Sequence, residues 1–244
     1  MADSTGPGDG AGDGVGEKEY RQHRFTRPPG ATEIILVRHG ESAPARLDQP
    51  PPSVDGRSDP PLDPQGQKEA DRVADRLQDV GVDAIYVTSL RRTVETAAPL
   101  AARLGLEPQV EPDLTEVYLG EWEGGIFRKH FAENHPIALQ ARTESRWDAI
   151  PGAESNEAFQ ARIRAGIARI VTAHPDQRVV AVTHGGVIGT IVEMATGARA
   201  FAFAGSDNGS ISHLVVLGEH WLIRRFNDTS HLDTDLDRPV QPLI

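Results

Sequence analysis

Histidine and arginine side chains occur together in three short polar segments, each of which directly follows an apolar run of strand-like residues. The segments are Arg38-His39-Gly40-Glu41, Thr88 to Thr93 with its two arginines, and Thr183-His184-Gly185-Gly186. A neutral histidine ring nitrogen can act as a covalent nucleophile, and arginine guanidinium groups bind phosphate oxygens in pairs. If the three segments meet, the sequence predicts a pocket for a phosphate-like anion with a histidine available to attack it.

The segments meet if the runs before them form one parallel sheet. Thr32 to Val37, Ala84 to Val87 and Arg178 to Thr183 are short, apolar and rich in β-branched residues, as expected for buried strands. The carboxyl ends of parallel strands share one edge of a sheet, where ligands bind beside helix amino termini. The pattern therefore predicts that both histidines and their arginines lie along one edge.

Helices are predicted between these strands from their caps and apolar spacing. Asp63 and Pro64 begin one helix that Gly81 ends, and Ser89 caps a second helix in which Pro99 should cause a kink or a broken turn. The remaining predicted elements are a short strand at 109–111, a helix at 156–173, a helix at 187–195 and an antiparallel hairpin formed by 211–217 and 221–226. The expected fold is a three-layer α/β/α sandwich with a mostly parallel sheet and an antiparallel hairpin at its edge.

The stretch LVRHGES, which contains His39, resembles the signature of the histidine phosphatase superfamily, in the branch that includes the cofactor-dependent phosphoglycerate mutases. The resemblance covers about residues 34–226. Its later blocks follow in the family's order: GRSDPPLDPQG (56–66), SLRRTVETA (89–97), LTEVYLGEWEG (114–124) and VTHGGVI (182–188). It implies a phosphoglycerate mutase-like fold and transfer of a phosphoryl group through a phosphohistidine.

The resemblance also implies a role for each matching residue. His39 would attack phosphorus, Glu116 would give a proton to the leaving oxygen, and His184 would bind the phosphoryl group in transfer. The implied substrate-binding residues are Arg38, Arg92 rather than its neighbour Arg91, and Gly185. On physical grounds, a hydrogen bond from the other ring nitrogen to a backbone carbonyl should fix the tautomer of His39. Two flanking arginines should keep that ring neutral.

Departures from the mutase pattern separate the possible activities. Residues 43–45 are Ala43-Pro44-Ala45, where mutases typically carry an asparagine, and Glu116 is followed by Val117-Tyr118-Leu119 instead of Arg-His-Tyr. Both changes remove groups that would hold a phosphoglycerate carboxylate, so the favoured activity is a phosphatase acting on a phosphomonoester. Phosphoglycerate mutase and a non-catalytic phosphate-binding regulatory module remain as alternatives.

The amino-acid composition limits the kinds of molecule that this protein is expected to bind. With 36 acidic and 25 basic residues the net charge is −11, which disfavours binding to nucleic acid or to a membrane surface. The absence of cysteine excludes thiol chemistry and thiolate zinc sites, and His130 and His135 lack the spacing of a helical zinc pair. We therefore expect no metal and no cofactor, a small phosphorylated metabolite as substrate, and a cytoplasmic protein that could form a homodimer.

The predicted domain organisation follows from glycine and proline content. Residues 1–30 are expected to form a disordered extension, because alternating glycines leave little apolar surface to bury. Residues 31–227 are expected to form the catalytic domain and 228–244 a tail. Within the domain, residues 125–151 show no clean period and are expected to form an irregular helical lid, with Arg128, Lys129, Arg142 and Arg146 near the pocket.

Overall fold

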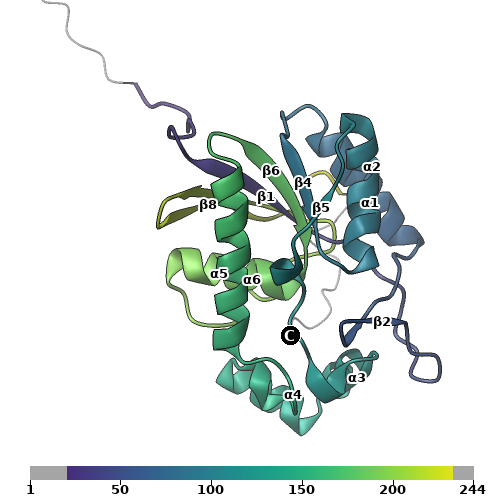
Figure 1. The fold of residues 1–244 in the computed structure, drawn as a ribbon. Helices are drawn as coiled ribbons and strands as arrows, with labels where there is room; N and C mark the ends of the chain where they lie inside the picture. Colours follow the sequence, from purple (N-terminus) through teal and green to yellow (C-terminus); the bar gives the residue numbers. More distant parts are fainter. Residues whose placement is uncertain (1–20, 233–244) are drawn as a thin grey trace, which may run out of the picture.

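The computed structural model describes residues 21–232, and its centre is a six-stranded sheet with the order β5-β4-β6-β1-β7-β8 (Figure 1). Four neighbouring strands are parallel: β5 (Gln109–Val110), β4 (Ala84–Val87), β6 (Arg178–Thr183) and β1 (Thr32–Arg38). The last two, β7 (Ile211–Leu217) and β8 (His220–Asp228), form the antiparallel hairpin at the edge. The predicted fold class is confirmed.

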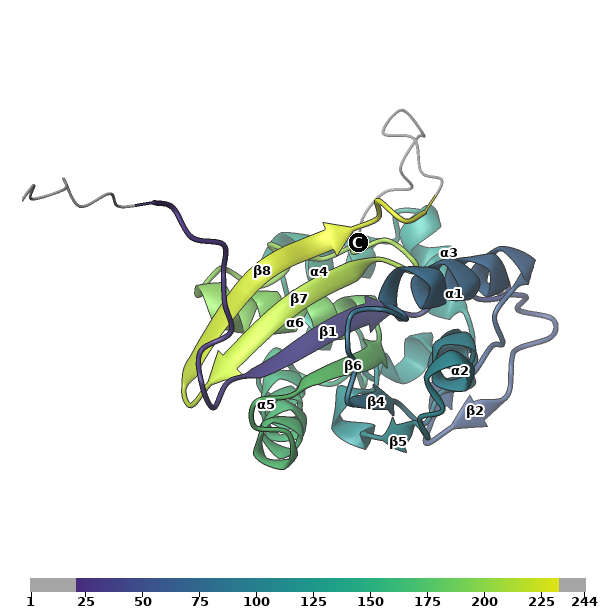
Figure 2. The ribbon, with the colours of Figure 1, turned by 90° about the horizontal axis from the view of Figure 1, so that it is seen from above.

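Helices cover both faces of this sheet, and β1 shows why (Figure 2). Successive side chains of a strand point to opposite faces. Ile35 and Val37 pack with helices α1 (Pro64–Leu77) and α2 (Arg91–Leu104), whereas Ile34 and Leu36 pack with α5 (Asn156–Ala173) and α6 (Gly185–Thr196). The sheet is therefore buried between two apolar layers, and continuous apolar strands such as TEIILV are what this burial requires.

The beginnings of the first two helices are stabilised in different ways. As predicted, Asp63 caps α1: its side chain accepts a hydrogen bond from the backbone N–H of Gly66 at 2.7 Å. Ser89 does not cap α2, which begins after Leu90. Instead the carboxylate of Asp59, 32 residues earlier in the chain, accepts from the backbone N–H of Arg91 at 2.8 Å. A cap supplied from a distant loop leaves no local sequence signal.

Two further helix predictions concern the end of α1 and Pro99 in α2. Helix α1 ends at Leu77, and Gly81 follows in the loop with a positive φ of 71°. Helix α2 runs through Pro99 without a broken turn, because the flanking Ala97, Leu100 and Ala101 are buried in the core. Tertiary packing here outweighs the hydrogen bond that proline cannot donate.

The predicted irregular segment contains two short helices, α3 (Ile126–Ala132) and α4 (Pro136–Glu144), followed by the 3₁₀ turn Trp147–Ala149. Two more 3₁₀ turns, Pro112–Leu114 and Gly120–Trp122, interrupt the segment that precedes α3. A two-stranded hairpin of β2 (Ser53–Val54) and β3 (Arg57–Ser58) lies in the proline-rich loop after β1.

The two ends of the chain were predicted as an extension (1–30) and a tail (228–244). Residues 1–20 and 233–244 lie outside the described part. Residues 21–30 form no regular element, and the ring of Phe25 lies 4.1 Å from the guanidinium carbon of Arg224 on β8. Asp228 is the last residue of β8. Between residues 21 and 232, no helix is both long and apolar enough to cross a membrane.

Candidate active site

Both histidines and both arginines lie at the carboxyl edge of the parallel strands. Arg38 ends β1, His184 follows β6 directly, and Arg92 lies in the first turn of α2. The Arg92 Nε atom is 3.2 Å from His39 Nε2, and the centroids of the His39 and His184 rings are 5.2 Å apart. Gly185 lies against Arg38, since a Cβ on this glycine would be 3.4 Å from Arg38 Nε.

The His39 ring is held in one tautomer by two hydrogen bonds. Its Nδ1–H donates to the backbone carbonyl of Gly40 at 2.7 Å, and its Nε2 accepts from Arg92 Nε. Burial lowers the pKa of His39 well below its ordinary value, and the positive charges of Arg92 and Arg38 lower it further. The ring is therefore neutral near pH 7, with its lone pair on Nε2.

The backbone of His39 is fixed from two sides. Its N–H donates to the carbonyl of Thr183 on β6 at 2.9 Å, and its carbonyl accepts from the Asn208 side chain at 2.9 Å. Arg38 donates to the carbonyl of Ser206 in the same loop as Asn208. Sequence reasoning missed Ser206 and Asn208, because nothing local links this loop to β1.

Two buried side-chain nitrogen atoms near His39 have no hydrogen-bond partner among the described residues: Arg38 Nε, and His184 Nδ1, which is a donor when Nε2 accepts from the Thr88 hydroxyl. The other ring nitrogen of His184, Nε2, is 3.1 Å from the Thr88 hydroxyl. Burial, followed by Arg92, lowers the pKa of His184 well below its ordinary value. Unpaired buried donors are costly and rare in proteins, and an anion would satisfy both of these.

The Glu116 carboxylate is held at the amino terminus of α6. Its Oε2 accepts from the backbone N–H of Gly186 at 3.1 Å, and its Oε1 accepts from its neighbour Val117 at 3.0 Å. A Cβ atom on Gly186 would lie 2.5 Å from Glu116 Oε1, so only glycine permits this approach. The two glycines after His184 thus contact two different candidate residues: Gly185 contacts Arg38, and Gly186 contacts Glu116.

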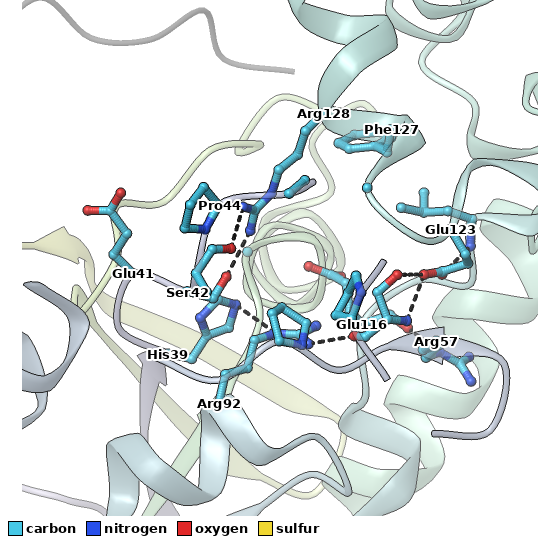
Figure 3. A pocket seen from close by; sticks show the side chains of 18 of the residues that line it. His39, Glu41, Ser42, Pro44, Arg57, Arg92, Glu116, Glu123, Phe127 and Arg128 are labelled. Atoms are coloured by element: carbon cyan, nitrogen blue, oxygen red, sulfur yellow. Dashed lines mark hydrogen bonds between the residues drawn. The ribbon is translucent and has the colours of Figure 1, made fainter. Parts of the chain in front are cut away.

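One end of a cavity of about 890 Å³ is lined by six of these residues: Arg38, His39, Arg92, Glu116, Gly185 and Gly186 (Figure 3). His184 is fully buried and does not line it. The other walls of the cavity combine apolar and polar side chains. The apolar ones are prolines of the loop after β1 and aromatic and aliphatic residues around α3: Pro44, Pro51, Pro52, Pro60, Pro61, Leu119, Trp122, Phe127 and Trp147. The charged ones are Glu41, Arg46, Arg57, Glu123, Arg128 and Asp207.

Of the four basic residues predicted near the pocket, Arg128 lines this cavity and donates to the Ser42 hydroxyl at 2.8 Å and to the Ala43 carbonyl at 3.1 Å. Lys129 lines a smaller neighbouring cavity. Arg142 packs over the Phe131 ring, and Arg146 bonds to Asp148 on the exposed surface.

A second pair of arginines, Arg57 and Arg162, was missed by the sequence analysis. Both donate to the backbone carbonyl of Glu116, at 2.8 Å and 3.0 Å. The one local signal was the position of Arg162 beside Ile163 on the apolar face of α5, where an arginine needs buried partners.

His130 and His135 stack on each other, with ring centroids 4.3 Å apart, and both contact the ring of Trp122. Within residues 21–232, no three histidine, aspartate or glutamate side chains are grouped so that they could hold a metal ion.

The model of the histidine phosphatase superfamily (branch 1) matches residues 34–229. The chain belongs to this superfamily. The matched range contains all six residues for which the resemblance implied a role.

Two similar proteins come from Arabidopsis thaliana. Phosphoglycerate mutase-like protein 4 is 34% identical over 206 residues, covering 82% of this chain and 87% of that protein. Metal-independent phosphoserine phosphatase is 33% identical over 207 residues, covering 83% of this chain and 84% of that protein. The native structure of mycobacterial glucosyl-3-phosphoglycerate phosphatase is 27% identical with a TM-score of 0.67, covering 81% of this chain and 99% of that one.

Proposed function

We propose that the chain is a metal-independent phosphatase that hydrolyses a phosphomonoester through a phosphohistidine on His39. The observation that carries this proposal is the tautomer of His39, with Nδ1–H bonded to Gly40 and the lone pair of Nε2 facing Arg92. Only a neutral ring with a free lone pair can attack phosphorus.

In the first step, His39 Nε2 forms a bond to phosphorus and the bond from phosphorus to the ester oxygen breaks. Glu116, as the acid, gives its proton to that oxygen, which leaves as an alcohol. We expect Arg92 to transfer its hydrogen bond from His39 to a phosphoryl oxygen, while Arg38 Nε and His184 Nδ1 donate to the others. These donors supply the charge stabilisation that metal ions supply in other phosphoryl transfer enzymes.

In the second step, water attacks the phosphohistidine. Glu116 accepts a proton from the water as its oxygen bonds to phosphorus and the bond from phosphorus to Nε2 breaks. Inorganic phosphate leaves, and His39 returns to its neutral form. The mycobacterial phosphatase structure has also been solved with inorganic phosphate, which supports phosphate as the shared ligand chemistry.

The substrate is a phosphorylated metabolite whose alcohol part lies between apolar walls. We call the lining residues Arg38, His39 and Arg92, together with the buried His184 ring 5.2 Å from His39, the phosphoryl end of the cavity. We call the walls that contain the prolines and aromatic residues the leaving-group end. Residues 125–151 are the proposed lid. Phe127 and Trp147 from this segment line the leaving-group end, and Arg128 ties the segment to Ser42.

Phosphoglycerate mutase is the second candidate, because relatives with that name include one that is 30% identical to this chain. Against it, Pro44 and Ala45 line the cavity in the stretch where mutases carry an asparagine. Incubation with 3-phosphoglycerate separates the two: a phosphatase releases inorganic phosphate, whereas a mutase produces 2-phosphoglycerate.

The central test is a phosphomonoester screen with and without a chelator, together with trapping of the phosphoenzyme. We expect hydrolysis that EDTA does not affect, and a phosphohistidine that is absent from His39→Gln, which should lose at least about a thousandfold in rate. Phosphohistidine in His39→Gln, or activity that EDTA removes and a divalent ion restores, would contradict the proposal. Phosphate binding without any phosphoenzyme would favour a regulatory module.

A further inference from the structure

Glu116 lies in a segment that forms no helix or strand of its own between the 3₁₀ turns at Pro112–Leu114 and Gly120–Trp122. Its backbone carbonyls therefore lack the partners that regular structure provides, and buried carbonyls need donors. A general acid in such a segment must be held by side chains from elsewhere in the fold.

Arg162, on α5, supplies most of these donors. Its Nη1 donates to the carbonyls of Asp113 and Thr115 at 2.8 Å and 2.6 Å, and its Nη2 donates to the carbonyl of Glu116 at 3.0 Å. The Arg162 side chain is only 17% exposed. One planar guanidinium thus fixes three carbonyls up to and including that of Glu116.

The Glu154 carboxylate orients this guanidinium by binding its Nε and Nη2 atoms. Its two oxygens accept from Arg162 Nε and Nη2 at 2.7 Å and 2.9 Å, so the pair is bidentate. Glu154 also binds the segment directly, since its side chain accepts from the N–H of Tyr118 at 3.3 Å and its own N–H donates to the Tyr118 carbonyl at 2.9 Å.

Arg57, from the β2–β3 hairpin, donates to the same carbonyl. Its Nε donates to Glu116 at 2.8 Å, its Nη2 is 3.8 Å from Glu154, and its side chain is 19% exposed. Figure 3 shows Arg57 beside Glu116, on the side away from His39. The Glu116 carbonyl is therefore held by two arginines while its carboxylate is held by α6.

We propose that Arg162, oriented by Glu154 and assisted by Arg57, is the positioning residue of the proton donor Glu116. This proposal rests on the proposed function. Arg162 touches neither the phosphoryl end nor the leaving-group walls, so it acts through the backbone of Glu116. Its loss should displace the acid relative to the leaving oxygen, and displacements of about 1 Å can cost about a hundredfold in rate.

If Arg162 only stabilised the fold, its loss would not affect proton transfer from Glu116. The test therefore needs a measurement that depends specifically on this proton transfer. That measurement is the ratio of phosphoenzyme formation rates with an alkyl phosphate (glycerol 1-phosphate) and an activated aryl phosphate (p-nitrophenyl phosphate). The alkyl leaving group needs a proton, whereas nitrophenolate leaves without one. Misplacement of Glu116 lowers the ratio, and a loss of folded protein leaves it unchanged.

Arg169 provides a matched control. It lies seven residues, about two turns, beyond Arg162 on α5 and makes a bidentate pair with Glu111 at 3.0 Å and 2.7 Å. It also donates to the Asp113 side chain, three residues before Glu116. Arg169→Met therefore removes a carboxylate-paired arginine from the same helix without touching the carbonyl of Glu116, although Arg169 is 53% exposed and Arg162 only 17%.

We expect Arg162→Met to lower the alkyl-to-aryl ratio about 10- to 100-fold, with partial recovery in Arg162→Lys. Arg57→Met should lower it less, and Arg169→Met should leave it within about twofold of the unmodified chain. In a Glu116→Gln background, Arg162→Met should not lower the ratio further, because both changes act on one group. If Arg162→Met does not fold, Glu154→Gln decides the question in the same way, because Glu154 does not line the cavity, whereas Arg57 does.

An unchanged ratio in folded Arg162→Met, or in Glu154→Gln where Arg162→Met does not fold, would overturn the positioning role. So would an equal fall in Arg169→Met. Absence of any phosphohistidine in the unmodified chain would instead refute the proposed function, so the two failures are distinguishable.

Discussion

At the phosphoryl end of the cavity the side chains come from the ends of buried strands and the starts of helices, whereas at the leaving-group end they come from loops and an insertion. His39, Arg92 and His184 are 6%, 9% and 0% exposed, respectively, and each makes hydrogen bonds to neighbouring elements. The opposite walls contain prolines and aromatic rings alongside charged side chains such as Arg57, Glu123 and Arg128. The rigid end can carry the chemistry common to the family, and the irregular end can vary with the substrate.

The difference has a physical basis. Charge stabilisation requires donors held in advance at fixed positions, which buried strand ends provide. Recognition of an alcohol by apolar walls is less directional, because it depends on the area buried rather than on the alignment of bonds. Substitutions at the two ends should therefore differ both in size and in which kinetic constant they change.

After loss of the nucleophile, the largest fall in rate is expected from Glu116→Gln. This variant tests the proton donor to the oxygen that joins the phosphoryl group to the leaving group. The amide keeps the hydrogen-bonding shape but cannot donate the proton, so alkyl phosphates should react about 10²–10⁴-fold more slowly and activated aryl phosphates only mildly so. Rates of phosphoenzyme formation measure this directly. Equal losses for both substrates would move the acid role to Glu123, which also lines the cavity.

Arg92→Met should lower kcat/KM about 10²–10³-fold for every substrate, since it removes a donor to the shared phosphoryl group. It should also change the pH profile. Burial and then Arg92 lower the pKa of His39, so without Arg92 this pKa rises towards its ordinary value. More of the ring is then protonated near pH 6, and the acid limb of kcat/KM moves to higher pH.

The neighbouring Arg91, which is exposed and paired with Glu95, is the control for this experiment. Arg91→Met should leave both the rate and the acid limb in place. A shift as large in Arg91→Met as in Arg92→Met would mean that the limb reports net charge rather than the contact with His39.

Gly186→Ala should reduce alkyl phosphate turnover by about tenfold to a hundredfold, because the new methyl group would overlap Glu116 Oε1. Gly197→Ala is the comparison for general backbone strain, since Gly197 has a positive φ of 67° but open space around it. Thermal melting should fall in both variants, whereas the alkyl-to-aryl ratio should fall only in Gly186→Ala.

The smallest effect is expected at the leaving-group end. Phe127 lines the cavity and packs on Phe131 with ring centroids 4.3 Å apart. Phe127→Ala should raise KM by a few-fold, about 1 kcal/mol of lost apolar contact, for bulky phosphomonoesters and leave small ones unchanged. Leu139→Ala, at an exposed position of α4, serves as the control. A fall in kcat that is equal for all substrates would show that the insertion supports the phosphoryl end instead.

Most of the fold followed from local patterns. The strands at 32–38, 84–87 and 178–183 and the helix at 156–173 were predicted nearly to the residue, because continuous apolar runs and helical spacing reflect burial directly. The errors concern ends that depend on distant partners. Asp59, and not Ser89, accepts a hydrogen bond from the first turn of α2. Helix α2 continues past Pro99, where core residues on both sides of the proline are buried.

The sequence alone identified the reactive types and the edge on which they meet, since His39 and His184 follow strands that had to be parallel neighbours. Only the tertiary structure decided how they are held. Asn208, Arg57 and Arg162 act on the backbones of His39 and Glu116 from 169, 59 and 46 residues away in the chain. Every residue has a backbone carbonyl that can accept a hydrogen bond, whatever its side chain. The sequence around the acceptor therefore contains no pattern that identifies its distant donor.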